Sequence, residues 1–258
     1  MSPSEHHPTE RFSGLAELYS QHRPAYPAAA MDFIISRCDL SDHTLLVDVG
    51  CGTGISSRLF AARGIKVVGI EPNADMRAQA ESMERSVGTT SLKYQEGRAE
   101  ATGLPEACAD AVVAAQAFHW FEPEATLREF HRILKPAGWA ILLWNQREES
   151  DPFTHAFGVV VRRLTNAEVF ERSYGKGDAL LARPLFQDGE RISFPNEQVL
   201  DEAGLLGRAF SASYAPKEGE SAQHYTEELR QVFQHFQKNG RVTMRYVTSL
   251  FLARRRSI

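Results

Sequence analysis

The sequence predicts an α/β fold whose mostly parallel sheet is covered by helices on both faces. Short β-branched runs alternate with helical stretches between about residues 43 and 145, which is typical of this class. The first run, 44–50 (TLLVDVG), is almost entirely apolar, as expected for a strand that is buried on both faces. A chain of 258 residues is also long enough to bury a substantial core.

The elements of this core follow the first strand in regular order. Residues 55–64 have the pattern of a short amphipathic helix that ends at Gly64, a typical C-cap residue. A second strand over 66–72 stops at a proline, and Asn73 is suited to cap the helix that follows. The remaining elements predicted for the core are strands 92–97, 110–120 and 138–146 and helices 73–86 and 123–136.

The patterns on either side of the core are weaker. Residues 11–37 predict one or two helices that are broken at 23–27 (RPAYP), because the two prolines there prevent a continuous helix. Residues 151–173 predict a helix, and residues 173–184 predict a loop.

The C-terminal part adds strands and a helix. Residues 190–200 alternate as a strand, and Pro195 places this strand at an edge or a bulge. Residues 224–240 predict a helix that ends at a glycine, and residues 241–255 predict a strongly β-prone strand. We expect this last strand to pair inside the sheet rather than across a dimer, although the chain could be a monomer or a homodimer.

Composition and charge narrow the classes of partner. Lysine and arginine total 29 against 33 acidic residues, and this net charge of −4 disfavours a nucleic-acid partner. The three cysteines lack paired spacing, and the nine histidines show no metal-ligand spacing with them, so we expect a reduced protein without a metal. No targeting segment and no apolar window of about 18 residues is found, so we expect a cytoplasmic protein without a membrane partner.

The segment 45–60 (LLVDVGCGTGISSRLF) passes from the first strand through three glycines into a helix. Such a turn offers backbone N–H groups and a positive helix end at the carboxyl edge of a parallel sheet, where ligands bind in open α/β folds. The dinucleotide motif is absent, because counting from Gly50 puts Ile55 at the sixth position. The P-loop motif is also absent, because Gly54 is followed by Ile55 and not by lysine.

Two carboxylates indicate a different ligand. Asp48 precedes the glycines and suits a ligand with an ammonium group better than it suits a pyrophosphate. Glu71 ends the second strand, and its two oxygens could accept hydrogen bonds from both hydroxyls of a ribose. A ligand with an amino-acid end, a ribose and no phosphate is S-adenosylmethionine. The alternative is that Glu71 is only a solvated strand end.

Residues 47–76 (VDVGCGTGISSRLFAARGIKVVGIEPNADM) resemble the first two motifs of the class I S-adenosylmethionine-dependent methyltransferases. The stretches 19–27, 97–105, 115–122 and 131–145 are similar to a small-molecule branch that includes the trans-aconitate methyltransferases. The resemblance implies a Rossmann-like, doubly wound, mostly parallel seven-stranded sheet of strand order 3-2-1-4-5-7-6. Strand 7 would be antiparallel, with helices on both faces and a helical N-terminal lid.

The same resemblance implies a single methyltransferase domain over residues 1–258. Within it, residues 1–40 would form the lid, 41–147 the cofactor-binding core and 148–258 an acceptor-side insertion followed by C-terminal strands.

The resemblance also implies a binding site for S-adenosylmethionine and its product, S-adenosylhomocysteine. The glycines of the loop would line the methionine portion, and the lid arginine would be a bidentate partner for its carboxylate. The predicted cofactor-binding residues are Tyr19, Arg23, Asp48, Gly50, Cys51, Gly52, Thr53, Gly54, Glu71, Pro72, Asn73, Met76, Arg98, Ala99, Glu100, Gln116 and Ala117.

Methyl transfer is an in-line displacement, and orientation alone can supply about 7–11 kcal/mol of its barrier, so a catalytic residue is optional. His119, just past the fourth strand, is the candidate catalytic base. Alternatively, His119 and Trp120 only pack the pocket floor and orient the ligand. The predicted substrate-binding residues are His119, Trp120 and Trp144, and the arginines that could recognise a carboxylated substrate are Arg147, Arg162, Arg163, Arg172 and Arg183.

The predicted function is methyl transfer from S-adenosylmethionine to a small-molecule acceptor, at an oxygen of a carboxylate or a hydroxyl. One alternative is a methyltransferase that acts on tRNA or protein, which the absence of a basic face disfavours. Another alternative is a protein that binds the cofactor without catalysing transfer.

Overall fold

Seven strands form one mixed sheet in the computed structural model, which describes residues 14, 16–87, 91–165, 177–182 and 184–257. Their order is β3-β2-β1-β4-β5-β7-β6, and β7 runs antiparallel to both of its neighbours while β1 to β5 pair in parallel. The predicted fold class and strand order are therefore confirmed. The strands are β1 Leu45–Val49, β2 Lys66–Ile70, β3 Leu92–Gln95, β4 Ala109–Ala115, β5 Leu134–Arg147, β6 Phe186–Leu200 and β7 Val242–Arg255.

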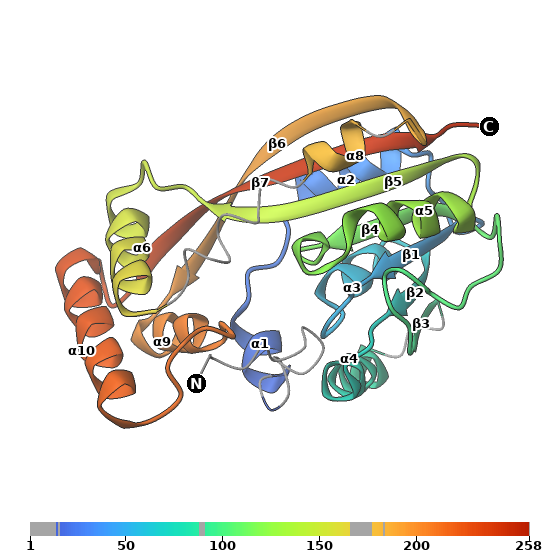
Figure 1. The fold of residues 1–258 in the computed structure, drawn as a ribbon. Helices are drawn as coiled ribbons and strands as arrows, with labels where there is room; N and C mark the ends of the chain where they lie inside the picture. The colour runs from blue at the N-terminus through green and yellow to red at the C-terminus, as the bar shows by residue number, and fades with distance from the viewer. Residues whose placement is uncertain (1–13, 15, 88–90, 166–176, 183, 258) are drawn as a thin grey trace.

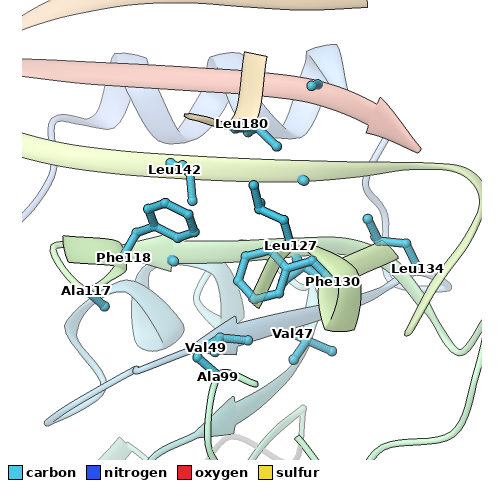
Figure 2. Packing of buried hydrophobic residues seen from close by; sticks show 14 of the residues in the cluster. Val47, Val49, Ala99, Ala117, Phe118, Leu127, Phe130, Leu134, Leu142 and Leu180 are labelled. Carbon is cyan, nitrogen blue, oxygen red and sulfur yellow. The ribbon is translucent and has the colours of Figure 1, made fainter. Parts of the chain in front are cut away.

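Helices cover both faces of this sheet because side chains alternate along its strands. On β1, Val47 and Val49 point into one apolar cluster and Leu46 into the other. Figure 2 shows the first cluster, where Leu127 and Phe130 pack against the sheet. The helices are α1 Ala16–His22, α2 Ala28–Arg37, α3 Ile55–Ala61, α4 Ala74–Val87, α5 Pro123–Ile133, α6 Pro152–Leu164, α8 Asp178–Leu181, α9 Glu202–Phe210 and α10 Gly219–Phe236, with a 3-10 turn η1 at Phe118–Trp120.

Several boundaries differ from those predicted. The fourth strand ends at Ala115 because Gln116 has a φ of 54°, which takes the chain out of the sheet. The helix predicted to reach residue 136 ends at Ile133, since the next residue, Leu134, is already extended and begins β5. The helix predicted from residue 224 begins earlier, at Gly219, and ends at Phe236.

Two further differences lie in the acceptor-side segment. The predicted loop 173–184 contains the short helix α8, and the end of the predicted helix 151–173, beyond residue 165, lies outside the described residues. Helix α9 had no counterpart among the predicted elements.

Strands β5, β6 and β7 have 14, 15 and 14 residues, whereas β1 has 5, so they extend beyond the rest of the sheet. At this extension α6, α9 and α10 lie together at one end of the molecule (Figure 1) and share a third apolar cluster. Pro195 lies on β6, which is an edge strand as predicted. The last strand pairs inside the sheet, also as predicted.

The N-terminal helices are broken where the prolines were expected to break them, at residues 23–27. Helix α1 packs against α9 on one side and α4 on the other (Figure 1). The link between α1 and α2 therefore crosses the carboxyl edge of the sheet. Among the described helices, none combines the length and hydropathy needed to cross a lipid bilayer.

Candidate functional site

A pocket of about 150 Å³ lies at the carboxyl ends of β1, β2 and β4 and beneath α1 and α9. Most of the residues predicted to bind cofactor or acceptor meet there. Those that line it are Tyr19, Arg23, Gly50, Cys51, Gly52, Glu71, Pro72, Asn73, Met76, Arg98, Ala99, Glu100, Gln116, Ala117 and Trp120. Phe121 lines it as well, and the lining residues that sequence reasoning did not single out are Pro24, Tyr26, Ile55, Ser56, Ala115, Asn145 and Arg208.

The glycines of the loop are explained by two different constraints, close packing behind the loop and exposed backbone at the pocket wall. Gly50 and Gly54 both have positive φ, and a side chain on either would collide with the protein itself, at Phe121 for Gly50 and at the Tyr94 hydroxyl for Gly54. Gly52 also has positive φ and, like Gly50, lines the pocket, and a Cβ there would make an ordinary contact with the end of the Met76 side chain at 3.4 Å. Packing therefore requires Gly50 and Gly54, whereas Gly52 brings bare backbone to the pocket wall.

The Glu71 carboxylate joins the glycine loop to helix α4. Its Oε2 accepts the N–H of Gly52 at 2.9 Å, and its Oε1 accepts the N–H of Asn73 at 2.9 Å. Only 8% of Glu71 is exposed, and this burial raises its pKa, while the two N–H donors oppose the shift. Each carboxylate oxygen can accept a second hydrogen bond, so Glu71 retains acceptor capacity toward the pocket.

Asp48 lies behind the loop and does not line the pocket. It is completely buried, and its Oδ2 accepts hydrogen bonds from the hydroxyls of Ser56 and Ser57, both at 2.6 Å. Asp48 thereby fixes the start of α3, where Ser56 reaches the pocket, and its direct contact with a ligand ammonium group stays a prediction. Burial raises the pKa of Asp48 to about 6, and the serine hydrogen bonds oppose that shift.

Thr53 and Gly54 also lie outside the pocket lining. The carbonyl of Thr53 accepts a hydrogen bond from the Arg58 guanidinium, which secures the loop from its rear side. At the start of helix α4, the predicted N-cap is confirmed, because Asn73 Oδ1 accepts the Met76 N–H at 2.9 Å.

Gln116 and Asn145 form the pocket floor between β4 and β5. The Oε1 of Gln116 accepts the backbone N–H of Asn145 at 2.8 Å, so this side chain continues the strand pairing past the end of β4. Gln116 has positive φ, which costs about 1–3 kcal/mol for a residue other than glycine. The Asn145 contact and the hydrogen bond from Gln116 N–H to the Leu143 carbonyl hold it in this conformation.

The link between α1 and α2 is tied down over the pocket. The carbonyl of Ala25 accepts hydrogen bonds from the side-chain amides of Asn145 at 3.2 Å and Asn196 at 2.8 Å. The carbonyl of His22 accepts one from Gln198 at 3.0 Å. Strands β5 and β6 therefore hold the N-terminal segment closed.

Two predicted lid residues lie together in this segment. The Arg23 guanidinium lies over the Tyr19 ring at 4.6 Å and donates a hydrogen bond to the Ser211 carbonyl at 3.3 Å. The Nε of Arg23 is buried and has no hydrogen-bond partner among the described residues. The geometry thus leaves a donor of a pocket-lining guanidinium available to a ligand.

Trp144 and His119 do not line the pocket. Trp144 has no exposed surface and packs edge-on against Phe251, so the structure places its neighbour Asn145 on the pocket side in its stead. His119 lies in η1, where its Nδ1 faces the Trp144 indole N–H at 3.4 Å. This contact requires Nδ1 to be the unprotonated nitrogen, so in a neutral ring Nε2 carries the hydrogen.

The three candidate arginines for substrate recognition that the structure describes lie outside the pocket lining. Arg147 and Arg162 pair with Glu149, and Arg163 pairs with Glu228 on the surface, while Arg172 and Arg183 lie outside the described residues. Among the described arginines of residues 148–258, Arg208 on α9 lines the pocket. No motif in the sequence distinguishes it, because its place depends on how α9 packs.

Residues 47–142 match a protein-family model described as "Methyltransferase domain". An uncharacterized methyltransferase of Mycobacterium tuberculosis is 30% identical over 156 residues, which cover 59% of each chain. An uncharacterized methyltransferase-like protein of Schizosaccharomyces pombe is 25% identical over 238 residues, 90% of this chain and 91% of the relative. The crystal structure of the YcgJ protein of Bacillus subtilis superposes with a TM-score of 0.59 at 16% identity, covering 90% of this chain and all of YcgJ.

These likenesses support the predicted class for residues 47–142, which match a methyltransferase domain, and YcgJ confirms the fold. The alignment with the Mycobacterium tuberculosis relative spans about three fifths of that protein's length. The activity of the whole chain and its methyl acceptor are therefore matters of proposal.

Asp48→Asn is expected to change how stability depends on pH. Since burial raises the Asp48 pKa from 3.8 to about 6, its contribution to stability is complete below pH 3.8 and is lost as the pH rises through 6. Relative to the variant, the ligand-free wild type should lose about 2 kcal/mol of unfolding free energy between about pH 4.5 and 7.5. Urea unfolding at several pH values measures this difference.

The exposed Asp42 provides the control for this experiment, because Asp42→Asn should keep the pH dependence of the wild type. Parallel stability curves for wild type and Asp48→Asn would contradict the predicted titration.

Proposed function

We propose that the chain transfers the methyl group of S-adenosylmethionine to an oxygen of a small-molecule acceptor. The proposal depends mainly on one observation. A single pocket joins the glycine loop and Glu71 to the ends of β4 and β5, and the link between α1 and α2 is tied down over it. This closed arrangement supports an acceptor that is small enough to be enclosed.

Three observations support the fit of S-adenosylmethionine to the residues of this pocket. Glu71 keeps acceptor capacity toward the pocket, as binding of the two ribose hydroxyls requires. Gly52 brings bare backbone to the wall, where the methionine portion would lie. The Nε of Arg23 is a buried donor without a described partner, which suits the carboxylate at the amino-acid end.

When bound, the cofactor supplies a methyl group on a positively charged sulfur that leaves as a neutral thioether. The acceptor oxygen donates the electron pair of the new C–O bond, and the electrons of the broken C–S bond go to sulfur. The chain's contribution is to hold the two reactants in line and to exclude water. The floor at Gln116 and Asn145 and the tied link above it suit that task.

A carboxylate acceptor needs no base, because it is already ionised at neutral pH. The arrangement at His119 supports this variant of the reaction. Its Nδ1 faces the Trp144 indole N–H, so the lone pair that a general base would use is already engaged. We therefore assign His119 a positioning role in preference to proton transfer, with a hydroxyl acceptor as the alternative that would need a base.

The finer predictions from the sequence belong to the same proposal. Membership of a branch similar to the trans-aconitate methyltransferases fits a small acceptor, and the continuity of one sheet from β1 to β7 fits a single domain over residues 1–258. A cytoplasmic location and a monomeric or homodimeric state stay predictions. A tRNA or protein acceptor is less consistent with the tied link, although opening of the link would admit one.

The decisive experiment uses S-adenosylmethionine with a labelled methyl group. The protein is incubated with the labelled cofactor and a cell extract separated into metabolites, protein and RNA. Label in a small product supports the proposal. Label in protein or RNA supports a macromolecular acceptor, and binding of S-adenosylhomocysteine without transfer of label identifies a non-catalytic binder.

Glu71→Gln is expected to weaken the binding of S-adenosylhomocysteine by at least about tenfold, because an amide has one acceptor oxygen in place of two and carries no charge. Isothermal calorimetry measures the affinity. The matched control is Glu96→Gln, which removes the same charge from an exposed side chain near the end of β3 and should leave the affinity unchanged. Equal affinities for wild type and Glu71→Gln would remove Glu71 from the cofactor site.

His119→Gln is expected to keep turnover within about tenfold of wild type, since its amide oxygen can replace Nδ1 as acceptor for the Trp144 indole, whereas His119→Phe should lose more. The labelled product of the extract experiment provides the assay. A loss of more than about a hundredfold in both variants, with a changed pH–rate profile, would instead indicate a general base.

A further inference from the structure

Tyr26 lies in the link between α1 and α2 and lines the pocket. It belongs to the apolar cluster that contains Leu46, and only 8% of the residue is exposed. Its hydroxyl makes no hydrogen bond with any residue that the structure describes. A buried tyrosine ordinarily pairs its hydroxyl, so a ligand in the pocket is the expected partner of this one.

The accessibility of this hydroxyl distinguishes Tyr26 from Tyr94 and Tyr225. The hydroxyls of those two tyrosines also lack a hydrogen-bond partner among the described residues, but they are completely covered by protein. The Tyr26 hydroxyl is not covered in this way, although the residue as a whole is buried. Because the residue packs in the core and lines the pocket, its accessible hydroxyl end faces the pocket.

The backbone on both sides of Tyr26 is held in place. The Ala25 carbonyl before it accepts hydrogen bonds from the side chains of Asn145 and Asn196. Pro27 after it is the N-cap of α2 with a φ of −66°, and a proline also restricts the residue that precedes it. The hydroxyl is therefore presented to the pocket from a fixed position and is not itself used for the anchoring.

The same anchor places Tyr26 away from the ribose site. Asn145, which binds the Ala25 carbonyl, lies on β5, and β5 is separated by β4 and β1 from β2, the strand that leads to Glu71. Three strand spacings amount to about 14 Å. Because the proposed function assigns Glu71 to the ribose and Gly52 to the methionine portion, a residue tied to β5 faces the part of the pocket left for the acceptor.

Two amides in this part of the pocket, those of Asn145 and Gln116, are engaged within the protein. The Nδ2 of Asn145 donates to the Ala25 carbonyl, and its Oδ1 accepts hydrogen bonds from the side chains of Asn196 and Thr248. The Oε1 of Gln116 accepts the Asn145 N–H. The donor that this region keeps for a ligand is therefore the hydroxyl of the tied link.

Tyr26 is suited to donate a hydrogen bond and not to remove a proton. Burial raises its pKa well above the usual value, and the nearby Tyr19 and Asp48 raise it further, while Arg23 opposes the shift. The hydroxyl therefore keeps its proton across the neutral pH range and can share it with an oxygen that has a free lone pair.

We propose that the Tyr26 hydroxyl donates a hydrogen bond to an oxygen of the methyl acceptor and thereby positions the acceptor for transfer. The inference rests on the proposed function, since it names the contact that holds the acceptor in the same pocket. With a carboxylate acceptor, one oxygen accepts the hydrogen bond and the other supplies the electron pair of the new C–O bond. The electrons of the broken C–S bond go to sulfur, and the Tyr26 proton stays on its hydroxyl.

The test measures transfer of the labelled methyl group to the metabolite fraction of a cell extract, at several dilutions of that fraction. Tyr26→Phe keeps the ring and loses only the hydroxyl, so it should lower the rate in the dilute fraction by at least about tenfold. Concentrating the fraction should recover part of this loss, because the hydrogen bond already holds the acceptor before transfer. The affinity for S-adenosylhomocysteine, measured by calorimetry, should stay within about twofold of wild type.

Tyr225→Phe is the matched control. It removes the same atom from a buried tyrosine of α10 that lies outside the pocket lining, so it should transfer label at the wild-type rate. The pH–rate profile of Tyr26→Phe should keep the wild-type shape, since a hydroxyl that stays protonated removes no proton from the acceptor. A changed shape would indicate a general base and overturn the inference.

Fluorine NMR keeps the test possible if Tyr26→Phe fails to fold. 3-Fluorotyrosine incorporated in place of Tyr26 retains the hydroxyl, and the protein is saturated with S-adenosylhomocysteine to prevent turnover. The fluorine resonance should shift when the metabolite fraction that receives label is added. 3-Fluorotyrosine in place of Tyr225 should show no shift.

Three results would overturn the inference and leave the proposed function standing. The first is transfer by Tyr26→Phe at the wild-type rate at every dilution, and the second is an unshifted resonance at position 26 with a fraction that receives label. The third is a loss of affinity for S-adenosylhomocysteine in Tyr26→Phe as large as that in Arg23→Gln, which would assign Tyr26 to the cofactor. Absence of label from the metabolite fraction with wild type would contradict the proposed function itself, and the inference with it.

Discussion

The pocket depends on two hydrogen bonds that the carboxylate of Glu71 accepts. This carboxylate lies at the end of β2 and accepts the backbone N–H of Gly52 from the loop after β1 and that of Asn73 from the start of α4. Two segments that a ligand would have to bridge are thereby held at a constant separation. Because the carboxylate is buried, each of these hydrogen bonds is stronger than it would be in water, and the loss of either donor would leave a charge poorly solvated.

The glycine loop depends on the same constraint. Gly52 can donate to Glu71 only with the backbone turned as it is, and Asp48 supports that turn from behind through Ser56 and Ser57. Gly50 and Gly54 allow Phe121 and Tyr94 to pack directly on the loop backbone. The loop is therefore held on three sides, and only its pocket side is left for a ligand.

The opposite wall is built by the long strands. The extension of β5, β6 and β7 carries α9 to the pocket, and with it Arg208, while Asn196 and Gln198 of β6 hold the N-terminal link. One sheet thus contributes to the pocket both the carboxyl ends of its short strands and the extension of its long ones. The hydrogen bonds from Arg208 through Tyr246 and Gln198 to His22 connect α9 to the link between α1 and α2.

The sequence by itself determined the alternation of strands and helices, the strand order implied by its resemblance, the glycine turn and the nature of the cofactor. Apart from the strand order, which the resemblance supplied, these features follow from local patterns, such as apolar runs, residues that tolerate positive φ and a carboxylate at a strand end. Only the tertiary structure decided that Asp48 lies behind the loop, that Asn145 and not Trp144 faces the pocket, and that Arg208 lines it. Each of these depends on a contact between segments far apart in the chain, and an arginine on an amphipathic helix carries no local sign of whether it faces water or a pocket.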